Sequence, residues 1–450
     1  MSDEVIRLSL RGRHAKLTSS QIIVSGFLAL ILLGTFLLML PISSRQPGWA
    51  HFSDCLFTAT SAVCVTGLVV QDTATYWTEF GQSIIIILIQ IGGMGVITVA
   101  VALAFLSGQK ISLRERSVMQ NSISAPQVGG IVRLTRMILT GTLFFEGIGA
   151  LLLLPVMIPR FGIGRGIYYA VFHSISAFCN AGFDLMGVQE PFSSLTGFSQ
   201  HVLLNVVIMM LITVGGIGFL VWQDVKEHGL HIAKYRLQSK VALLTSLILV
   251  LLPAAYLYFF ELSSLDPLHR ILPSLFQSVT LRTAGFNTMD LGRISSSGHG
   301  LMMFCMLIGG SPGSTAGGLK TTTLTVLVMT AVSVFRRQDS VSFLGRRVDE
   351  QTVKQAIALL IMYLTLFFLG AVVICRIERL PLISCLFETA SAVGTVGITL
   401  GITSRLGTVS RLILIALMFL GRVGGLTLIY AAQSGHVSKK MLPLEKLTVG

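Results

Sequence analysis

Four short stretches of the sequence repeat the same order of residue types and end in glycine. In each, a phenylalanine begins a run of small, hydroxyl and apolar residues, and the glycine follows nine or ten positions later. Glycine has no Cβ, so it adopts positive φ at little cost and lets the backbone approach a ligand closely. Such a backbone can present successive carbonyl oxygens to a cation that has shed its water. The predicted chemistry is therefore cation coordination, without covalent catalysis.

The carbonyl oxygens are expected to come from the last five residues of each stretch. These are Val63, Cys64, Val65, Thr66 and Gly67; Phe178, Cys179, Asn180, Ala181 and Gly182; Leu281, Arg282, Thr283, Ala284 and Gly285; and Val393, Gly394, Thr395, Val396 and Gly397. One such stretch would be weak support for an ion site, but four in matched context predict a fourfold internal repeat. The alternative is that the glycines only pack helices or form loops, duplicated without a pore.

The composition indicates what must position these stretches. Of the 450 residues, 53% are hydrophobic and 12% are charged, and the mean hydropathy is +0.79. Soluble domains carry about 25% charged residues, so we expect an integral membrane protein. Apolar runs that can cross a bilayer occupy residues 22–41, 83–106, 137–158, 201–222, 241–260, 301–335, 355–375 and 411–432.

The glycine stretches lie between these runs. In each, an apolar patch that is too short to span the membrane comes directly before the glycine. Non-helical backbone at membrane depth must be buried in protein or line water, so the four stretches should converge on one pore. The expected fold is an all-α membrane protein, with eight transmembrane helices arranged as four pseudo-symmetric span, pore-helix and span repeats. The repeats are predicted at 22–106, 137–222, 241–335 and 355–432, between termini at 1–21 and 433–450.

The net charge of +13 is explained by topology. Most Lys and Arg residues lie in the N-terminus, in alternate loops and in the C-terminus. The positive-inside rule therefore places both termini in the cytoplasm. We expect a multi-pass protein of the plasma membrane. A nucleic-acid partner is therefore not expected. The six cysteines form no C-x-x-C pair, so neither a zinc site nor a disulfide framework is indicated. No cleaved signal peptide is expected either.

A glycine-rich stretch at 309–323 interrupts the sixth apolar run and is predicted to break its helix. Charges at membrane depth are costly, so Lys320 and Arg422, the latter near the middle of the last run, are candidate functional residues. Lys320 could instead extend to the interface. The break and the two charges single out Gly310, Ser311, Pro312, Gly313, Ser314, Thr315, Ala316, Gly317, Gly318, Lys320 and Arg422, whose role as a gate is implied by the resemblance described next.

The segments VCVTG (63–67), FCNAG (178–182), LRTAGF (281–286) and VGTVG (393–397) resemble the membrane subunits of Trk/Ktr/HKT potassium transporters, the Ktr type in particular. The resemblance implies potassium uptake by a channel or symporter, with four filter glycines favouring potassium. It also implies that the stretch at 309–323 occludes the pore beneath the filter and that Arg422 pairs with this gate region. A sodium-permeable or weakly selective pore of the same fold is the alternative.

The same resemblance implies a homodimer in the lipid bilayer, seated on a cytosolic ring of nucleotide-binding regulatory subunits. Nucleotide would then bind only to the partner, and sodium is a candidate activator. The loops around Arg114, Lys234 and Arg346 are candidate docking surfaces, although anionic lipid would also be attracted to them. The tail at 441–450 is expected at the dimer interface.

Other functions are less favoured. Residues 309–313 match the G-x-S-x-G motif of hydrolases, but they lie in an apolar run without the required strand-to-helix context. A transporter with two inverted repeats disagrees with four repeats of one orientation. The sequence leaves open whether Glu146 is structural or lines the ion path. It also leaves open whether Asp72, Asp184 and Asp290 make the outer vestibule negative or are ordinary loop acids.

Overall fold

A computed structural model describes residues 18–96, 98–99, 112–123 and 129–432, with the single positions 443 and 445. Its α-helices are α1 Ser19–Met39, α2 Phe52–Val63, α3 Thr73–Tyr76, α4 Glu79–Met94, α6 Leu113–Ile123, α7 Ile131–Phe161, α8 Ile163–Phe178, α9 Val202–Gly216, α10 Phe219–His228, α11 Leu237–Tyr256, α12 Pro267–Thr280, α13 Ser296–Leu307, α14 Thr321–Phe335, α15 Glu350–Glu378, α16 Leu382–Gly394, α17 Thr408–Val423 and α18 Gly425–Ala432. Strands β1 (Ser342–Phe343) and β2 (Arg346–Arg347) form a small antiparallel hairpin.

Four helices in the described ranges are long and apolar enough to cross a membrane: α1, α7, α11 with its π-helical extension to Glu261, and α15. They correspond to the predicted first span of each repeat. Two bent pairs raise this number to six if each pair counts as one span: α9 with α10, bent by 93°, and α17 with α18, bent by 95°. By length and composition, the described residues therefore hold four to six candidate spans, compared with the eight expected from the apolar runs.

The predicted second spans are broken at glycines. The apolar runs at 83–106, 201–222 and 411–432 were each expected to provide a spanning helix, but α4, α9 and α17, which overlap these runs, end before Gly95, Ile217 and Gly424. Gly95, Gly218 and Gly424 have φ of +88°, +101° and +86°. A right-handed helix cannot continue through a residue with positive φ, which explains the breaks.

The third repeat is interrupted by a longer segment, as the glycine-rich stretch predicts. Helix α13 ends at Leu307 and α14 begins at Thr321, so the final three residues of the predicted stretch 309–323 are helical. We call residues 308–320 the intramembrane loop. Its two ends pair through a parallel bridge between Ile308 and Leu319.

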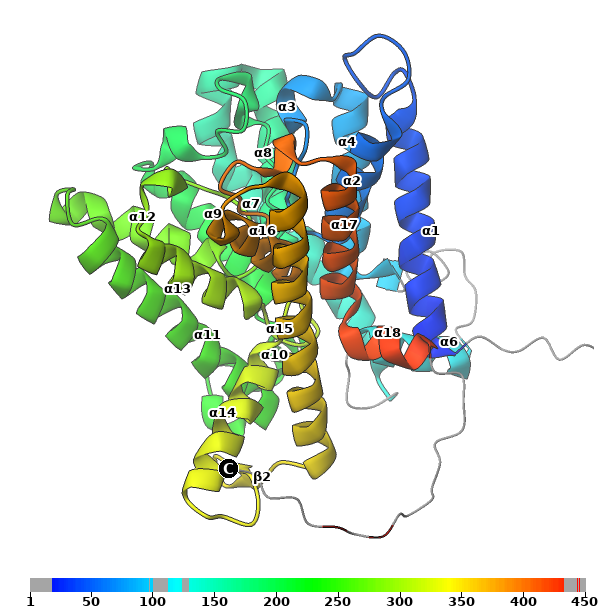
Figure 1. The fold of residues 1–450 in the computed structure, drawn as a ribbon, viewed down its shortest axis with the longest axis vertical. Helices are drawn as coiled ribbons and strands as arrows, with labels where there is room; N and C mark the ends of the chain where they lie inside the picture. The colour runs from blue at the N-terminus through cyan, green and yellow to red at the C-terminus, as the bar shows by residue number, and fades with distance from the viewer. Residues whose placement is uncertain are drawn as a thin grey trace, which may run out of the picture.

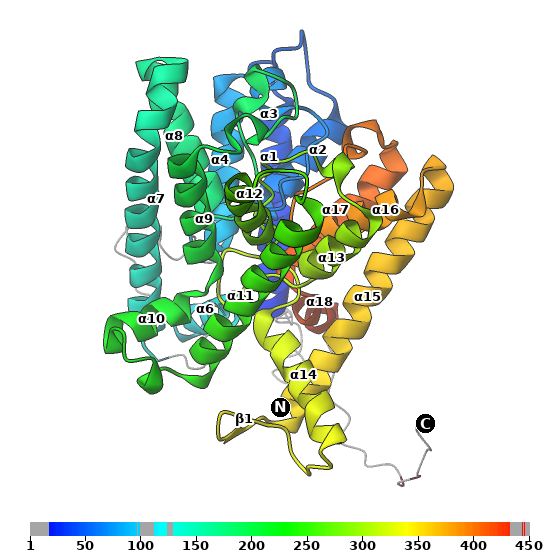
Figure 2. The same cartoon turned by 90° about the vertical axis from the view of Figure 1, so that its left-hand side faces the viewer.

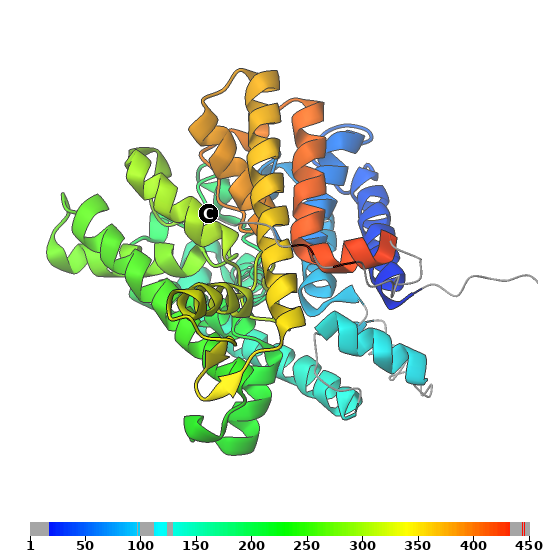
Figure 3. The same ribbon diagram turned by 60° about the horizontal axis from the view of Figure 1, so that its bottom comes forward.

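The short helices α2, α8, α12 and α16 lie inside the bundle, and the long helices α1, α7 and α15 lie toward its outside (Figures 1 and 2). In Figure 3, with the lower end turned forward, α6, α10 and α18 lie across this end of the bundle. The β hairpin projects from the same end, below α14. Outward residues of α7 and α15 such as Leu151 and Ile361 are exposed, as expected for a surface that faces lipid.

Candidate functional site

The four glycine-terminated stretches adopt one backbone shape. Each follows a short buried helix, and the residue two positions before the glycine has positive φ in every case. These residues and their φ values are Val65 (55°), Asn180 (58°), Thr283 (64°) and Thr395 (51°), and the glycines are Gly67 (92°), Gly182 (68°), Gly285 (84°) and Gly397 (93°). The left-handed conformation is uncommon for residues with a side chain. Its recurrence at matched positions marks a shared structural requirement.

The four glycines close a ring, which we call the glycine ring. A Cβ added to each glycine would meet the backbone of the next stretch, and the fourth would meet the first. The added Cβ would lie 2.5 Å from the Ala181 oxygen at Gly67, 2.7 Å from the Ala284 oxygen at Gly182 and 2.6 Å from the Val396 oxygen at Gly285, and would collide with the Thr66 oxygen at Gly397. All four stretches are therefore in contact around one axis.

A hydroxyl group supports each stretch from its own short helix, and the sequence analysis missed this feature. The hydroxyls of Ser61 and Ser391 accept hydrogen bonds from the backbone N–H of Gly67 (3.1 Å) and Gly397 (3.0 Å). In the other two stretches, the Ser176 hydroxyl donates to the Phe183 oxygen and the Thr280 hydroxyl to the Phe286 oxygen, both at 2.7 Å. A signal was present, because each hydroxyl residue is the fourth after the starting phenylalanine.

Neighbouring stretches are also linked by a side chain. The Asn180 amide donates to the Arg282 carbonyl oxygen at 3.3 Å. The Arg282 side chain is 7% exposed and lines a small cavity with Thr213 and Val250. The predicted coordinating residues are thus brought together through their backbones, while the charged side chain of Arg282 is buried between helices.

The intramembrane loop lies against the second and fourth stretches of the ring. The Thr315 hydroxyl is 3.2 Å from the Phe178 carbonyl oxygen and 3.3 Å from the Asn180 side-chain oxygen. A Cβ added to Gly317 would collide with the side chain of Thr395. Only a residue without a side chain fits this close approach, which places the predicted gate segment next to the predicted filter.

The loop is fixed to the break between α9 and α10. The backbone N–H of Ser311 donates to the Gly216 oxygen at 3.0 Å, and that of Thr315 donates to the Gly215 oxygen at 3.2 Å. In the other direction, the first residue of α10, Phe219, donates to the Gly313 oxygen at 2.6 Å. The carbonyl groups at the end of α9, which have no partner within their helix, are therefore satisfied by the loop.

Arg422 joins the loop to another helix. Its guanidinium donates to the carbonyl oxygens of Thr315, in the loop, and of Gly92 and Gly93, in the last turn of α4. Arg422 was expected near the middle of its span, but it is the next-to-last residue of α17 because Gly424 ends that helix. Three buried carbonyl groups thereby share one delocalised cation, which suits the fork geometry of arginine.

Lys320 turns back onto the loop. Its amine donates to the Ala316 oxygen at 2.7 Å and to the Gly317 oxygen at 3.4 Å. The alternative arrangement, extension to the interface, is not the one seen. Lys320 and Arg422 both line a cavity of about 210 Å³, together with Gly313 and Gly95.

Glu146 lies behind the second stretch of the ring. One of its carboxylate oxygens accepts a hydrogen bond from the Gln90 amide at 3.2 Å, and the other is 3.9 Å from the Cys179 sulfur. The Ser174 hydroxyl donates to the Glu146 carbonyl oxygen at 2.6 Å. These contacts favour the structural role, support of the neighbouring hairpin, over a place in the ion path.

The three outer acids differ in environment. Asp72 caps α3 and accepts the Phe192 N–H at 2.8 Å, and Asp290 ion-pairs with Arg293 at 3.2 Å, so both serve local structure. Asp184 lies two residues beyond Gly182 and accepts the Met186 N–H at 2.9 Å. Burial, reinforced by the negative charge of Asp72, raises the pKa of Asp184 to about 7.

The remaining predicted features lie at the edges of the described structure. Lys234 and Arg346 are exposed, as a docking surface requires. The side chain of Arg114 lies outside the described residues, as do 1–17 and, except for 443 and 445, the tail at 441–450. All six cysteines are free. Ser311 of the G-x-S-x-G match is 3.2 Å from the Thr321 hydroxyl, within a loop and not at a strand-to-helix turn.

Comparison with known proteins identifies the family. The TrkH family model, described as a cation transport protein, matches residues 11–442. The potassium/sodium uptake protein NtpJ of Enterococcus hirae is 39% identical over 427 residues, which cover 92% of this chain and 93% of the relative. The Ktr system potassium uptake protein B of Bacillus subtilis is 37% identical over 425 residues, covering 93% of this chain and 94% of that protein.

A solved structure has the same fold. The crystal structure of the potassium transporter TrkH from Vibrio parahaemolyticus superposes with a TM-score of 0.74 and 19% sequence identity, over 94% of this chain and 87% of the other. A helical multi-pass membrane protein was expected from the hydropathy, and this part of the prediction is confirmed. The family consists of transporters, not enzymes. The chain belongs to the TrkH family of cation transport proteins.

Proposed function

We propose that this chain takes up potassium ions across the plasma membrane through the glycine ring. The observation that carries the proposal is the cyclic contact of Gly67, Gly182, Gly285 and Gly397, each against a carbonyl oxygen of the next stretch. A ring of backbone carbonyl groups can replace the hydration shell of a cation. The coordinating atoms would be the carbonyl oxygens of 63–67, 178–182, 281–285 and 393–397.

The proposed topology has eight membrane passages in four repeats, with both termini in the cytoplasm. Figure 1 supports an even number of passages, because α1 begins and α18 lies at the same end of the molecule. The repeats would be 22–106, 137–222, 241–335 and 355–432. The glycine breaks would then turn the second passages of the first, second and fourth repeats near the cytoplasmic face.

The intramembrane loop is the proposed gate, held by Arg422. The proposal is supported by the contacts of Thr315 with the ring and of Arg422 with the end of α4. In this position the loop would occupy the path beneath the ring. Conduction requires this loop to move. The energy for its movement would come from partners, since the relatives of the Ktr system carry names that imply further components.

The proposed assembly is a homodimer in the bilayer on a cytosolic ring of nucleotide-binding subunits. Exposed Arg346 and Lys234 lie where such a ring would dock under the proposed topology. Nucleotide would act through this partner, and sodium is proposed as an activator. A sodium-permeable pore is the second candidate function, because one relative is named a potassium/sodium uptake protein.

The test is ion flux into liposomes that hold the purified chain, with a protonophore present to prevent voltage build-up. Potassium and sodium uptake are measured in parallel, with empty liposomes as the control. Potassium-preferring flux is expected. Equal flux of both ions would favour the sodium-permeable pore. If flux is absent, the measurement is repeated with the loop freed by Arg422→Gln, and absence there as well would overturn the pore.

A further inference from the structure

A large basic pocket lies at the lower end of α7, away from the ring and the loop. Its volume is about 950 Å³, and it is bounded by the first turns of α7, by α10 and by the residue that precedes α11. Figure 2 shows α10 crossing the foot of α7. Four cationic side chains line the pocket, against the carboxylate of Glu227: Arg133, Arg136, Lys226 and Arg236.

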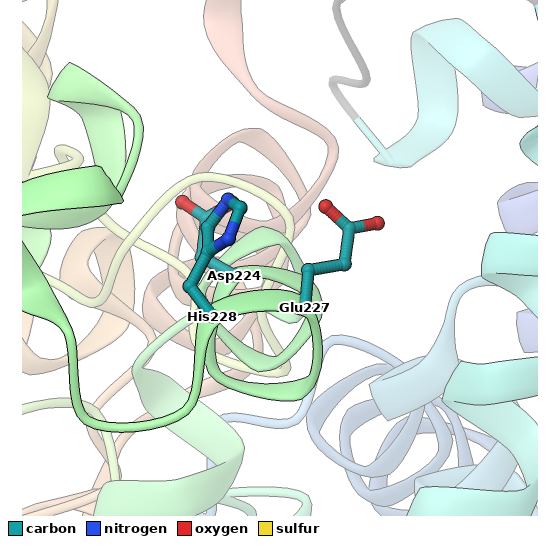
Figure 4. Close-up of side chains that lie close together, drawn as sticks. All are labelled: Asp224, Glu227 and His228. Carbon is teal, nitrogen blue, oxygen red and sulfur yellow. The ribbon is translucent and has the colours of Figure 1, made fainter.

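The acidic residues of α10 are already engaged by Arg236. The Asp224 carboxylate lies 3.5 Å from the Arg236 guanidinium and accepts the Arg236 backbone N–H at 3.0 Å, and Glu227 is 3.9 Å from the same guanidinium. Asp224, Glu227 and His228 lie close together (Figure 4), with possible ligand atoms within 4.8 Å of one another. Arg236 already balances the negative charge of this cluster. We therefore assign the cluster to the wall of the pocket and not to a metal site.

The other three cations have no such partner. Within the part of the chain that the structure describes, no carboxylate lies within 4.0 Å of Arg133, Arg136 or Lys226. All three side chains are exposed and face one cavity. Like charges around a cavity repel one another, so an anion bound between them would be stabilised. The pocket therefore has the charge of an anion site.

An apolar surface continues from the pocket along the same face of α7. Thr140 lines the pocket, and Leu143, Phe144 and Leu151 follow at helical spacing with exposed fractions of 68%, 61% and 66%. Residues three, four and seven apart share one helix face. The 31 residues of α7 extend about 46 Å, more than the roughly 30 Å of a hydrocarbon core. The basic end of this face thus lies at headgroup depth and the apolar part at acyl-chain depth.

We propose that the basic pocket binds the phosphate headgroup of an anionic phospholipid, whose acyl chains lie along the exposed face of α7. A soluble phosphate would use only the cations, whereas a phospholipid matches both the cations and the adjoining apolar face. Basic pockets at the cytoplasmic side of membrane helices suit such headgroups. The proposal depends on the topology proposed above only for the leaflet, which would be the cytoplasmic one.

The lipid would be coupled to the intramembrane loop through α10. Lys226 belongs to α10, and the first residue of the same helix, Phe219, donates to the Gly313 oxygen of the loop at 2.6 Å. A headgroup shared by Lys226 and the two α7 arginines would hold α10 against α7. Bound lipid would therefore stabilise the observed position of the loop.

The experiment measures quenching of Trp222 by brominated lipids in detergent micelles, with the full chain. Trp222 is a local reporter, because a Cβ added to Gly141, the neighbour of Thr140, would lie 2.8 Å from its ring. The signal that disappears in Trp222→Phe is assigned to this site. Brominated phosphatidylglycerol is titrated against brominated phosphatidylcholine, using the parent chain and a pocket variant in which Arg133, Arg136 and Lys226 are changed to Gln.

The parent chain is expected to prefer phosphatidylglycerol, and the pocket variant to need roughly a hundredfold more of it for half-maximal quenching. A matched control changes two arginines and a lysine that are exposed at the end of α14 and the start of α15, Arg336, Arg337 and Lys354, to Gln and should behave like the parent. Unchanged quenching by phosphatidylcholine verifies that the pocket variant is folded.

Equal loss in both variants, or no lipid preference in the parent, would overturn the proposal. Displacement of the lipid by glycerol 3-phosphate at equal concentration would assign the pocket to a soluble phosphate and would also overturn it.

Discussion

The glycine ring and the intramembrane loop lie next to each other but differ in construction, because the ring is a repeated motif and the loop occurs once. The ring uses four copies of one design, each with a short helix, a supporting hydroxyl, a residue at positive φ and a glycine. The loop occurs once, between α13 and α14, and depends on contacts with residues of other repeats such as Gly92, Phe178 and Gly216. Symmetry thus fixes the ring, whereas the loop, which has no counterpart in the other repeats, is the part proposed to move.

The two regions should respond differently to substitution. In the ring, each glycine touches the next stretch, so a change at one position displaces a neighbour and alters the geometry of the whole ring. The loop is held by backbone hydrogen bonds to the break between α9 and α10 and by side-chain hydrogen bonds of residues such as Thr315 and Arg422. Loss of a side-chain bond should therefore weaken the hold on the loop without altering the ring. Ring variants are therefore expected to change which ion passes, and loop variants to change how much passes.

The largest effect is expected from Gly67→Ser. The serine Cβ would lie 2.5 Å from the Ala181 oxygen and would occupy φ of +92°, a conformation that costs other residues about 1–2 kcal/mol. The Ala181 carbonyl must move, so the ratio of potassium to sodium flux should fall roughly tenfold or more. Parallel flux measurements in liposomes check this.

Gly401→Ser is the matched control for the ring. Gly401 has φ of +86° and lies just beyond the fourth stretch, but a Cβ there would meet nothing within 4 Å. The backbone strain is comparable and the collision is absent, so the selectivity should stay that of the parent. Unchanged selectivity in a folded Gly67→Ser chain would show that Gly67 is not part of the filter.

Arg422→Gln is the corresponding test of the loop. The change removes a cation bonded to carbonyl oxygens in the loop and in α4, where each hydrogen bond to a charged group contributes about 1.5–3 kcal/mol. Flux without a partner should rise about tenfold at unchanged selectivity. Arg405→Gln, at an exposed position, is the control. A folded Arg422→Gln chain with unchanged or lower flux would contradict the role of Arg422 in holding the gate.

The same contrast explains how much could be predicted from the sequence. The ring positions were predictable because one physical requirement, close approach of backbones, selects glycine at four matched sites such as Gly67 and Gly397. The first spans were predictable from hydropathy alone. Both signals are local or repeated, so no knowledge of distant contacts was needed.

The remaining features are not revealed by hydropathy, although the helix breaks fall at glycines such as Gly95, Gly218 and Gly424. Ile217 and Phe219 flank Gly218, and Gly424 lies in a run that is apolar overall, so hydropathy is the same whether the helix continues or bends. The partners of Arg422 are backbone carbonyl groups far away in the chain, including that of Gly92. Any residue type carries a carbonyl group, so these partners could not be identified from residue identity.

A smaller effect is expected from Thr315→Val, which keeps the shape of the side chain and removes its hydroxyl. That hydroxyl contacts the Phe178 carbonyl oxygen and the Asn180 side chain, and a typical hydrogen bond contributes about 1 kcal/mol. Flux should rise about fivefold, with the ion preference retained. In the control Thr330→Val, only a bond within α14 is lost. A change in selectivity without a change in flux would show that Thr315 belongs to the ring and not to the gate.

The smallest effect should come from Asp184, which lies two residues beyond Gly182 and belongs to neither region. Burial and then the negative charge of Asp72 raise its pKa to about 7, so the side chain is mostly protonated at pH 6 and mostly ionised at pH 8. A carboxylate two residues beyond Gly182 attracts cations only when ionised, and the interaction across partly solvated space is on the order of 0.5 kcal/mol. The apparent affinity for external potassium should therefore improve about twofold between these pH values in the parent and stay constant in Asp184→Asn. Asp290→Asn, which removes an exposed carboxylate paired with Arg293, should keep the parental pH dependence. A pH dependence that persists in Asp184→Asn would show that another group titrates. Ring geometry, and not the charge of Asp184, would then determine ion capture.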